Sequence, residues 1–223
     1  FWDSQQVRAK VYALKGTVGM LQQYALKKRF GLVAEDEMAR DLVGEINSEI
    51  GGDLIRKIIA NAQGNTDWDK AAPDNVSYYE HKHTFKDALA DAEGVLVANA
   101  GRGMISVMTA GTKACAILST LPGFEKLTDG KVTGPVLYGT LVGTPVIRVT
   151  DTTVQASNVV IPLWKGTSPF EAAAVYTPYM PLAVTSTLPD APNPLGSMKA
   201  AAVWAGVDVM VDKFITKLTI LNA

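Results

Sequence analysis

The sequence predicts an α+β protein, and three observations predict this class. The chain has 223 residues, of which 48% are hydrophobic and only 19% are charged, which is typical of a globular protein with a substantial core. Residues 34–60 carry a helical apolar stripe, whereas residues 135–163 and 172–211 are rich in extended patterns. Because helices and strands do not alternate regularly, a doubly wound parallel sheet is not expected.

The first two predicted elements are a strand and a short helix. Residues 5–21 alternate loosely between apolar and polar side chains, as a half-buried strand does. A short basic segment follows and ends in KKRFG, where Gly31 is a typical helix stop.

The strongest pattern predicts one long helix over residues 34–60. Acidic side chains fill its first turn, and Arg56 and Lys57 lie near its end, which suits the helix dipole. At 1.5 Å per residue it would be about 40 Å long. Gly51 and Gly52 predict either a kink or the close approach of another backbone. The apolar stripe recurs every four residues: Met38, Leu42, Ile46, Ile50, Leu54 and Ile58.

The middle of the chain predicts a loop, two helices and several short strands. Residues 61–77 are interpreted as a loop or hairpin. Thr84 and Asp87 predict a capping box that opens a second helix, which ends at Gly101. The strand MISVM then leads to a third helix over residues 109–121. Three short strands follow (VLYGTLVG, TPVIRVT and NVVIPLW), and KFITKLTIL predicts a last strand at the end of the chain.

The stretch AAAVYTPYMPLAVTS, residues 172–186, predicts a long strand at the edge of a sheet. Pro178 and Pro181 interrupt it, and proline cannot donate a ladder hydrogen bond, so it is confined to edges, strand starts and bulges. A long free edge invites pairing with another chain. Tyr176 and Tyr179 are therefore predicted to be contact residues.

Charge and composition exclude some classes of function. The chain has 21 basic and 22 acidic residues and a net charge of -1, so strong binding to nucleic-acid phosphates is not expected. It shows no run of about 18 uncharged apolar residues that would predict a membrane span, and no secretory leader. Cys115 is the only cysteine, which favours a reducing compartment and a small buried core residue over a reactive thiol.

His81 and His83 form an H-x-H pair that, on a strand, would share one face with Tyr79 and Phe85. Such a pair can hold a metal, but a zinc site needs at least three protein ligands. The nearby Glu80 would point to the opposite face. A packed or surface pair of histidines is therefore the preferred interpretation.

Two other motifs fail in detail. NTDWDKAAPDNV resembles a calcium loop, but Lys70 replaces the required glycine and Val76 the required glutamate, so a solvated loop is preferred. NAGRGMIS has Ser106 where a phosphate-binding G-x-G-x-x-G motif needs its third glycine. A helix-to-strand turn explains Gly101 and Gly103. No catalytic, cofactor-binding or metal-binding residue is therefore assigned, and no cofactor is expected.

Several segments together resemble the major capsid proteins of tailed bacteriophages that have the Hong Kong 97 fold, in particular the T-even-like branch with contractile tails. YGTLVGTPVIRVTD followed by VVIPLWKG is similar to a glycine-rich element of that family. In the same order as in the family, three other segments resemble its long spine helix, a strand-helix unit and a Tyr-x-Pro-Tyr strand: DEMARDLVGEINSEIGGDLI, ISVMTAGTKACAILSTL and AAAVYTPYMPLAVTS.

The resemblance implies a peripheral domain with the spine helix and a long sheet, and an axial domain with a central sheet flanked by helices. It places residues 1–84 and 175–223 in the former and residues 85–174 in the latter. The family's N-terminal arm and extended loop are not recognisable, and the chain opens with Phe1, which suggests a processed, trimmed or incomplete chain. No residue for the covalent crosslink of some family members can be assigned.

The resemblance also implies a function and partners. The chain would assemble with itself into an icosahedral virion shell, as hexamers and pentamers or as hexamers with a vertex protein, in the host cytoplasm. Portal, scaffolding and decoration proteins would be further partners, and double-stranded DNA would be enclosed without sequence-specific binding. Two alternatives stay open: an encapsulin-like nanocompartment shell, and a cytosolic α+β enzyme that uses Cys115 or the His81 and His83 pair.

Overall fold

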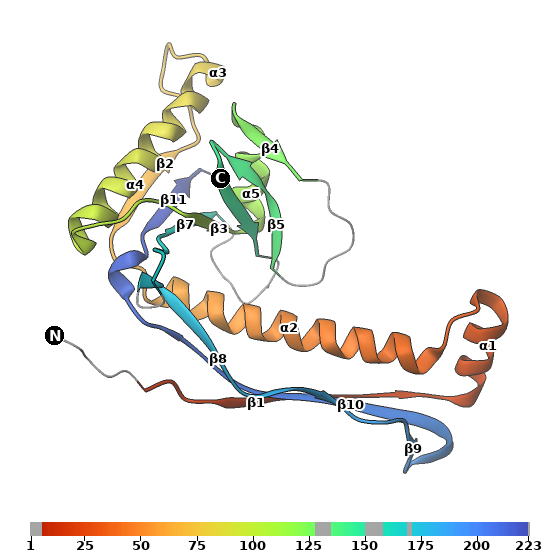
Figure 1. The fold of residues 1–223 in the computed structure, drawn as a ribbon. Helices are drawn as coiled ribbons and strands as arrows, with labels where there is room; N and C mark the ends of the chain where they lie inside the picture. The colour runs from red at the N-terminus through yellow and green to blue at the C-terminus, as the bar shows by residue number, and fades with distance from the viewer. Residues whose placement is uncertain (1–5, 128–134, 150–157, 169–170, 223) are drawn as a thin grey trace. The chain divides into compact units, whose positions relative to one another are not determined.

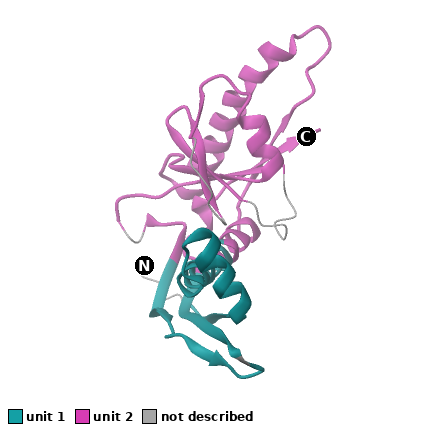
Figure 2. Cartoon of the chain, turned by 90° about the vertical axis from the view of Figure 1, so that its right-hand side faces the viewer, with its two compact units in different colours: residues 1–51, 176–207 teal, residues 52–175, 208–223 magenta. Residues whose placement is uncertain are grey.

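The computed structural model describes residues 6–127, 135–149, 158–168 and 171–222. Phe1, the start of the predicted strand at residue 5, and the ends of TPVIRVT and YGTLVGTPVIRVTD lie outside the described residues. Helices and strands are mixed without regular alternation (Figure 1), which confirms the predicted α+β class. The chain divides into two compact units (Figure 2): unit 1 is residues 1–51 and 176–207, and unit 2 is residues 52–175 and 208–223.

These units differ from the sequence-based domain boundaries. Residues 52–84 and 208–223 belong to unit 2, whereas the sequence-based division grouped them with residues 1–51 and 176–207. The boundary along the long helix falls between Gly51 and Gly52, the pair of glycines that the sequence marks. Which unit is peripheral and which is axial in a shell stays a prediction.

In unit 1, residues 34–51 of a long helix lie along one face of a sheet. The helix α2 (Ala34–Ala60) has the bounds that the sequence predicts, with Glu35, Asp36 and Glu37 in its first turn and Lys57 in its last. Its sheet contains β1 (Lys10–Val18), β10 (Asn193–Val209), β8 (Ala174–Val184) and β9 (Leu188–Asp190). The strand order is β1-β10-β8, and β9 pairs with β10. Figure 1 shows the first part of α2, which belongs to unit 1, running alongside these strands.

Alternation along the strands produces the core of unit 1. In the antiparallel pair β1 and β10, Tyr12 faces Val203 and Leu14 faces Ala201. Successive side chains of a strand point to opposite faces, so these residues meet the apolar stripe of α2. The resulting buried cluster contains Tyr12, Met38, Leu42, Ile46, Ala201, Val203 and Ala205.

The helix α1 (Met20–Phe30) connects β1 to α2 and confirms the predicted short basic helix. It ends at Gly31, whose φ of 68° is the left-handed conformation that glycine adopts at helix ends, and whose N–H donates to the carbonyl oxygen of Lys27. The helix starts at Met20, so the predicted strand ends earlier than residue 21. None of the α1 side chains is buried.

Unit 2 is built on a seven-stranded mixed sheet with the order β2-β11-β7-β3-β6-β5-β4. Its strands are β2 (Asn65–Asp69), β3 (Val107–Ala110), β4 (Phe124–Lys126), β5 (Val136–Leu141), β6 (Thr144–Arg148), β7 (Val159–Leu163) and β11 (Lys217–Leu221). The helices are α3 (Tyr78–His81), α4 (Phe85–Ala100) and α5 (Thr112–Leu118), and two short 3₁₀ turns cover Lys82–Thr84 and Asp212–Phe214.

Both faces of this sheet are covered. Along β7, Val160 belongs to a core with α4 and α5, while Val159 and Ile161 belong to a second core that contains Ile58 from the end of α2. This period of two explains why β7 is buried almost throughout. The first core contains Trp68, which is 5% exposed, and Phe85, which is 0% exposed.

Two local predictions are wrong. Residues 65–69 form β2, which pairs in parallel with β11, and are therefore neither loop nor hairpin. Thr84 makes no capping bond to the helix, because its hydroxyl is used elsewhere: it accepts from Trp68 Nε1 at 3.0 Å and donates to the carbonyl oxygen of His81 at 2.7 Å. The helix that begins at Phe85 and ends at Gly101 is nevertheless present.

Candidate functional site

The two histidines lie in a helical segment and do not share a strand face. His81 is buried, and its ring stacks on Trp68 with centroids 5.4 Å apart. Its Nε2 is 2.7 Å from the carbonyl oxygen of Asp69; since a carbonyl can only accept, Nε2 carries the proton. His83 is exposed and contacts Tyr79 edge to face. In the described part of the chain, no group of three or more His, Cys, Asp or Glu residues could hold a metal ion.

The predicted calcium-like segment uses its carboxylates within the fold. Asp67 accepts a hydrogen bond from Asn65 on the same strand, β2. Asp69 accepts from Asn222 at 2.9 and 3.0 Å and from the N–H of Ala71 at 2.8 Å. The bonds from Asn222 and then from Ala71 hold the pKa of the Asp69 carboxyl below its ordinary value.

Cys115 is a small core residue, as predicted. It is 1% exposed, and its Sγ donates to the carbonyl oxygen of Ala110 at 3.5 Å. Burial raises the pKa of the thiol from its ordinary value of 9.0 to about 12, against a smaller opposing effect of the Arg148 charge. A neutral, enclosed thiol is a poor nucleophile.

We expect Cys115 to resist thiol reagents in the folded protein at pH 8 and to react fully after denaturation. Because the folded state holds this proton more tightly than the unfolded state, the free energy of unfolding should fall as pH rises from 9.0 toward about 12. Stopped-flow labelling with and without denaturant checks the first point. Rapid labelling of the folded protein would contradict it.

The glycine pair near the end of α4 forms a helix-to-strand turn, as predicted. Gly101 ends the helix with a φ of 71°, and Gly103 has a φ of 112°. A Cβ at Gly103 would lie 2.8 Å from the Trp164 ring. Arg102 points to protein groups, since it pairs with Glu171 at 3.1 Å and lies 5.7 Å from the centre of the Trp164 ring. The turn therefore serves packing.

The strand β8 is an exposed sheet edge, which confirms the prediction from its prolines. It borders only β10 in the strand order of the unit 1 sheet, and all residues from 176 to 189 are exposed. Tyr179 is 74% exposed and packs edge to face on Trp204, with centroids 4.7 Å apart. Tyr176 is 45% exposed. An edge of this length is open to pairing with another chain.

Unit 1 also exposes most of the large apolar side chains that the structure leaves in solvent. Contiguous exposed apolar surface marks contact sites in soluble proteins. The contribution of α1 is not evident from the sequence, because the apolar residues of this helix form no clear stripe. These exposed residues are Val11, Met20, Leu21, Tyr24, Phe30, Leu32, Val33, Tyr176, Tyr179, Met180, Leu182, Val184, Leu188, Leu195 and Trp204.

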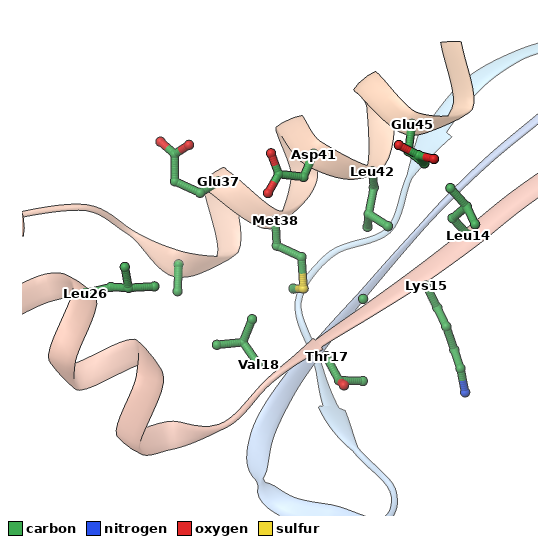
Figure 3. Close-up of a pocket in the computed structure, with 12 residues that line it drawn as sticks. Leu14, Lys15, Thr17, Val18, Leu26, Glu37, Met38, Asp41, Leu42 and Glu45 are labelled. Carbon is green, nitrogen blue, oxygen red and sulfur yellow. The ribbon is translucent and has the colours of Figure 1, made fainter. Parts of the chain in front are cut away.

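A groove of about 520 Å³ lies within unit 1 between β1, α1 and the first half of α2 (Figure 3). Its apolar lining includes Leu14, Val18, Leu26, Met38 and Leu42. Charged residues complete it: Lys15, Glu37, Asp41 and Glu45. The groove is not evident from the sequence, because it forms only when β1 packs against α2.

None of the described helices is both long and apolar enough to span a membrane. The exposed part of β8 from residue 176 onward, the helix α1 and the groove all lie in unit 1.

Comparison with known proteins identifies relatives of this architecture. The family model described as major capsid protein Gp23 matches residues 2–202. No curated protein matches the chain.

Solved structures are similar in fold, at low sequence identity. One described as Gordonia phage Cozz is 11% identical with a TM-score of 0.63, and the match covers 98% of this chain and 72% of that one. The capsid of Myoviridae phage XM1 is 12% identical with a TM-score of 0.54, over 96% and 74% of the chains. The holo-SrpI encapsulin complex of Synechococcus elongatus PCC 7942 is 13% identical with a TM-score of 0.58, over 95% and 73%.

Proposed function

The chain belongs to the family of Gp23 major capsid proteins, and on this premise we propose that it builds an icosahedral virion shell through the exposed edge and apolar surface of unit 1. Its fold is the α+β capsid fold of phage shells, and the family points to a structural rather than a catalytic role. The observation that carries the proposal is the exposed stretch 176–189 at the margin of the unit 1 sheet.

Each subunit of a closed shell must meet several neighbours at once. Long elements and free edges suit this task, because they present contact surface away from the subunit's own core. The helix α2, at about 40 Å, would act as a stiff support for the sheet whose edge is β8. Single contacts can be modest, since a subunit held on several sides must break several contacts to leave.

We assign unit 1 to the peripheral role and the seven-stranded sheet of unit 2 to the axial role. The partners we propose are copies of the chain, as hexamers and pentamers or as hexamers with a vertex protein. Portal, scaffolding and decoration proteins would complete the particle, which would assemble in the host cytoplasm and enclose double-stranded DNA.

Size-exclusion chromatography of the full gene product tests the proposal. We expect particles that elute in the void volume, together with a small pool of free subunits. A small monomer or dimer under every assembly condition, with a chemical activity lost on changing His81 to alanine, would support an enzyme instead. The positions of His81 and Cys115 in the core do not favour that alternative.

An encapsulin-like shell is the second candidate, supported by the fold similarity to the Synechococcus encapsulin. The two candidates differ in what the shell encloses. Nuclease-protected DNA of genome length inside purified particles supports a virion shell, whereas an enclosed cargo protein supports the encapsulin alternative.

Replacing Tyr176 and Tyr179 together by lysine should block assembly while the subunit stays folded. Both side chains are exposed, so the subunit loses only the Tyr179–Trp204 ring contact, worth about 1 kcal/mol. At a contact between copies, however, two lysines would be buried without partners. The concentration needed for assembly should therefore rise at least about tenfold, as light scattering measures.

A matched control exists in unit 2, where Tyr78 and Tyr79 are 45% and 69% exposed. Lysines at these two positions should leave assembly unchanged, because α3 offers no free strand edge. Equal assembly of both double variants and the wild type would exclude β8 as a contact.

The free subunit should bind duplex DNA weakly and in a strongly salt-sensitive way, or not at all. The basic residues of the chain are balanced by acidic ones, with a net charge of -1, so we expect few phosphate counterions to be displaced on binding. Fluorescence anisotropy with a short duplex at 150 mM salt, about the physiological ionic strength, measures this. Nanomolar affinity there would contradict passive enclosure of the genome.

A further inference from the structure

The groove of unit 1 has an apolar floor and an acidic rim. Met38 and Leu42 of α2 face Leu14 and Val18 across the groove, as the close-up in Figure 3 shows. Glu37, Asp41 and Glu45 follow one another at intervals of four residues, which places them on one face of α2. An elongated apolar surface bordered by carboxylates suits a segment that is both apolar and basic.

The carboxylates of this rim are poorly neutralised by their own chain. Glu37 pairs with Arg40 at 3.0 Å. Within the described residues, Asp41 and Glu45 form no ion pair. Lys15 is the one basic residue of the groove lining, and its side chain extends away from Met38 and Leu42 in Figure 3.

The last turn of α1 has the complementary character. It carries Lys27, Lys28 and Arg29, all exposed, and none of them forms an ion pair within the described part of the chain. Next to them, Phe30 is 69% exposed and Tyr24 is 63% exposed. A helix of 11 residues without a buried side chain has little stability of its own, so a partner surface would stabilise it.

We propose that the groove of one copy receives the basic end of α1 from a second copy. This contact rests on the shell function proposed above and deepens it. Phe30 and Tyr24 cover the apolar floor, while Lys27, Lys28 and Arg29 meet Asp41 and Glu45. Within the described residues, neither set has an ion-pair partner, and Lys28 lies over the Tyr24 ring of its own helix, with Nζ 5.4 Å from the ring centre. The two sets are complementary in charge, so a second copy provides the partner that each lacks. Because the two surfaces differ, the contact is head-to-tail, and it forms a closed ring where the rotation from one copy to the next closes.

Charge reversal tests this pairing. One variant carries Lys27→Glu, Lys28→Glu and Arg29→Glu; another carries Glu37→Lys, Asp41→Lys and Glu45→Lys. Each places like charges across the contact, so each should raise the concentration needed for assembly at least about tenfold. A third variant carries all six changes, which restores opposite charges between copies, and it should assemble within about threefold of the wild type.

Two controls accompany the series. Glu80, Asp87 and Asp91 are exposed carboxylates of unit 2, and changing all three to lysine reproduces the charge change without touching the groove; this variant should assemble normally. Circular dichroism during heating shows whether each variant is folded.

The outcomes separate the contact from the shell function. If the wild type forms shells and the six-change variant assembles no better than either three-change variant, the α1 end and the groove do not face each other, and the pairing is overturned. The pairing is also overturned if the wild type forms shells and neither three-change variant raises the concentration needed for assembly. Absence of shells from the wild type would instead overturn the proposed function.

Discussion

Replacing Ile46 with aspartate should unfold unit 1 and abolish shell assembly. Ile46 is 0% exposed and belongs to the buried cluster between α2 and the sheet of unit 1. A carboxylate there has no partner and loses its hydration, so we expect the free energy of unfolding to fall by more than about 4 kcal/mol. Urea denaturation followed by circular dichroism measures the loss, and analytical ultracentrifugation measures assembly.

Asn47→Asp is the matched control. The neighbouring residue is exposed on the same helix, so the same new charge remains hydrated and should change neither stability nor assembly appreciably. Normal shells formed by the Ile46→Asp variant would show that the buried face of α2 has been misassigned.

Phe85→Ala should have a comparable effect on unit 2. Phe85 is 0% exposed and contacts the Trp68 ring edge to face, with centroids 5.2 Å apart. Removing a buried phenyl ring leaves a cavity and should cost about 3–5 kcal/mol of unfolding free energy. The midpoint of denaturation, followed by the fluorescence of the tryptophans, should move to clearly lower denaturant concentration.

Val97→Ala serves as the comparison, because Val97 lies on the same helix and is 38% exposed. This truncation should cost less than about 1 kcal/mol. If the two variants were equally stable, Phe85 would not be a central part of the unit 2 core.

The parts of the fold with strong local patterns were predictable from the sequence. The bounds of α2 follow from the four-residue recurrence of its apolar stripe and from its charged ends. The edge position of β8 follows from Pro178 and Pro181, since proline restricts a strand regardless of its partners. The resemblance to phage capsid proteins was also found in the sequence and is confirmed by the family match.

The elements that depend on distant partners were not predictable. β2 is five residues long and pairs with β11, about 150 residues later in the chain. Thr84 has the spacing of a capping residue, but its hydroxyl accepts a hydrogen bond from Trp68 Nε1. The ring of His81 stacks on the same Trp68. In these cases tertiary contacts outweigh local propensity.

The candidate site divides in the same way. Tyr176 and Tyr179 could be identified because they flank a proline in an edge strand. The groove could not, because Leu14 and Met38 meet only when β1 packs against α2. The acidic row Glu37, Asp41 and Glu45 is visible in the sequence. That Asp41 and Glu45 form no ion pair within the described residues becomes apparent only in the folded unit.

An electron micrograph of the purified full gene product, taken under assembly conditions, tests whether copies of this protein assemble into a closed shell. We expect closed particles of uniform diameter, whose averaged images show rings of repeated subunits. A field of dispersed single subunits at every concentration and salt condition would contradict the shell function.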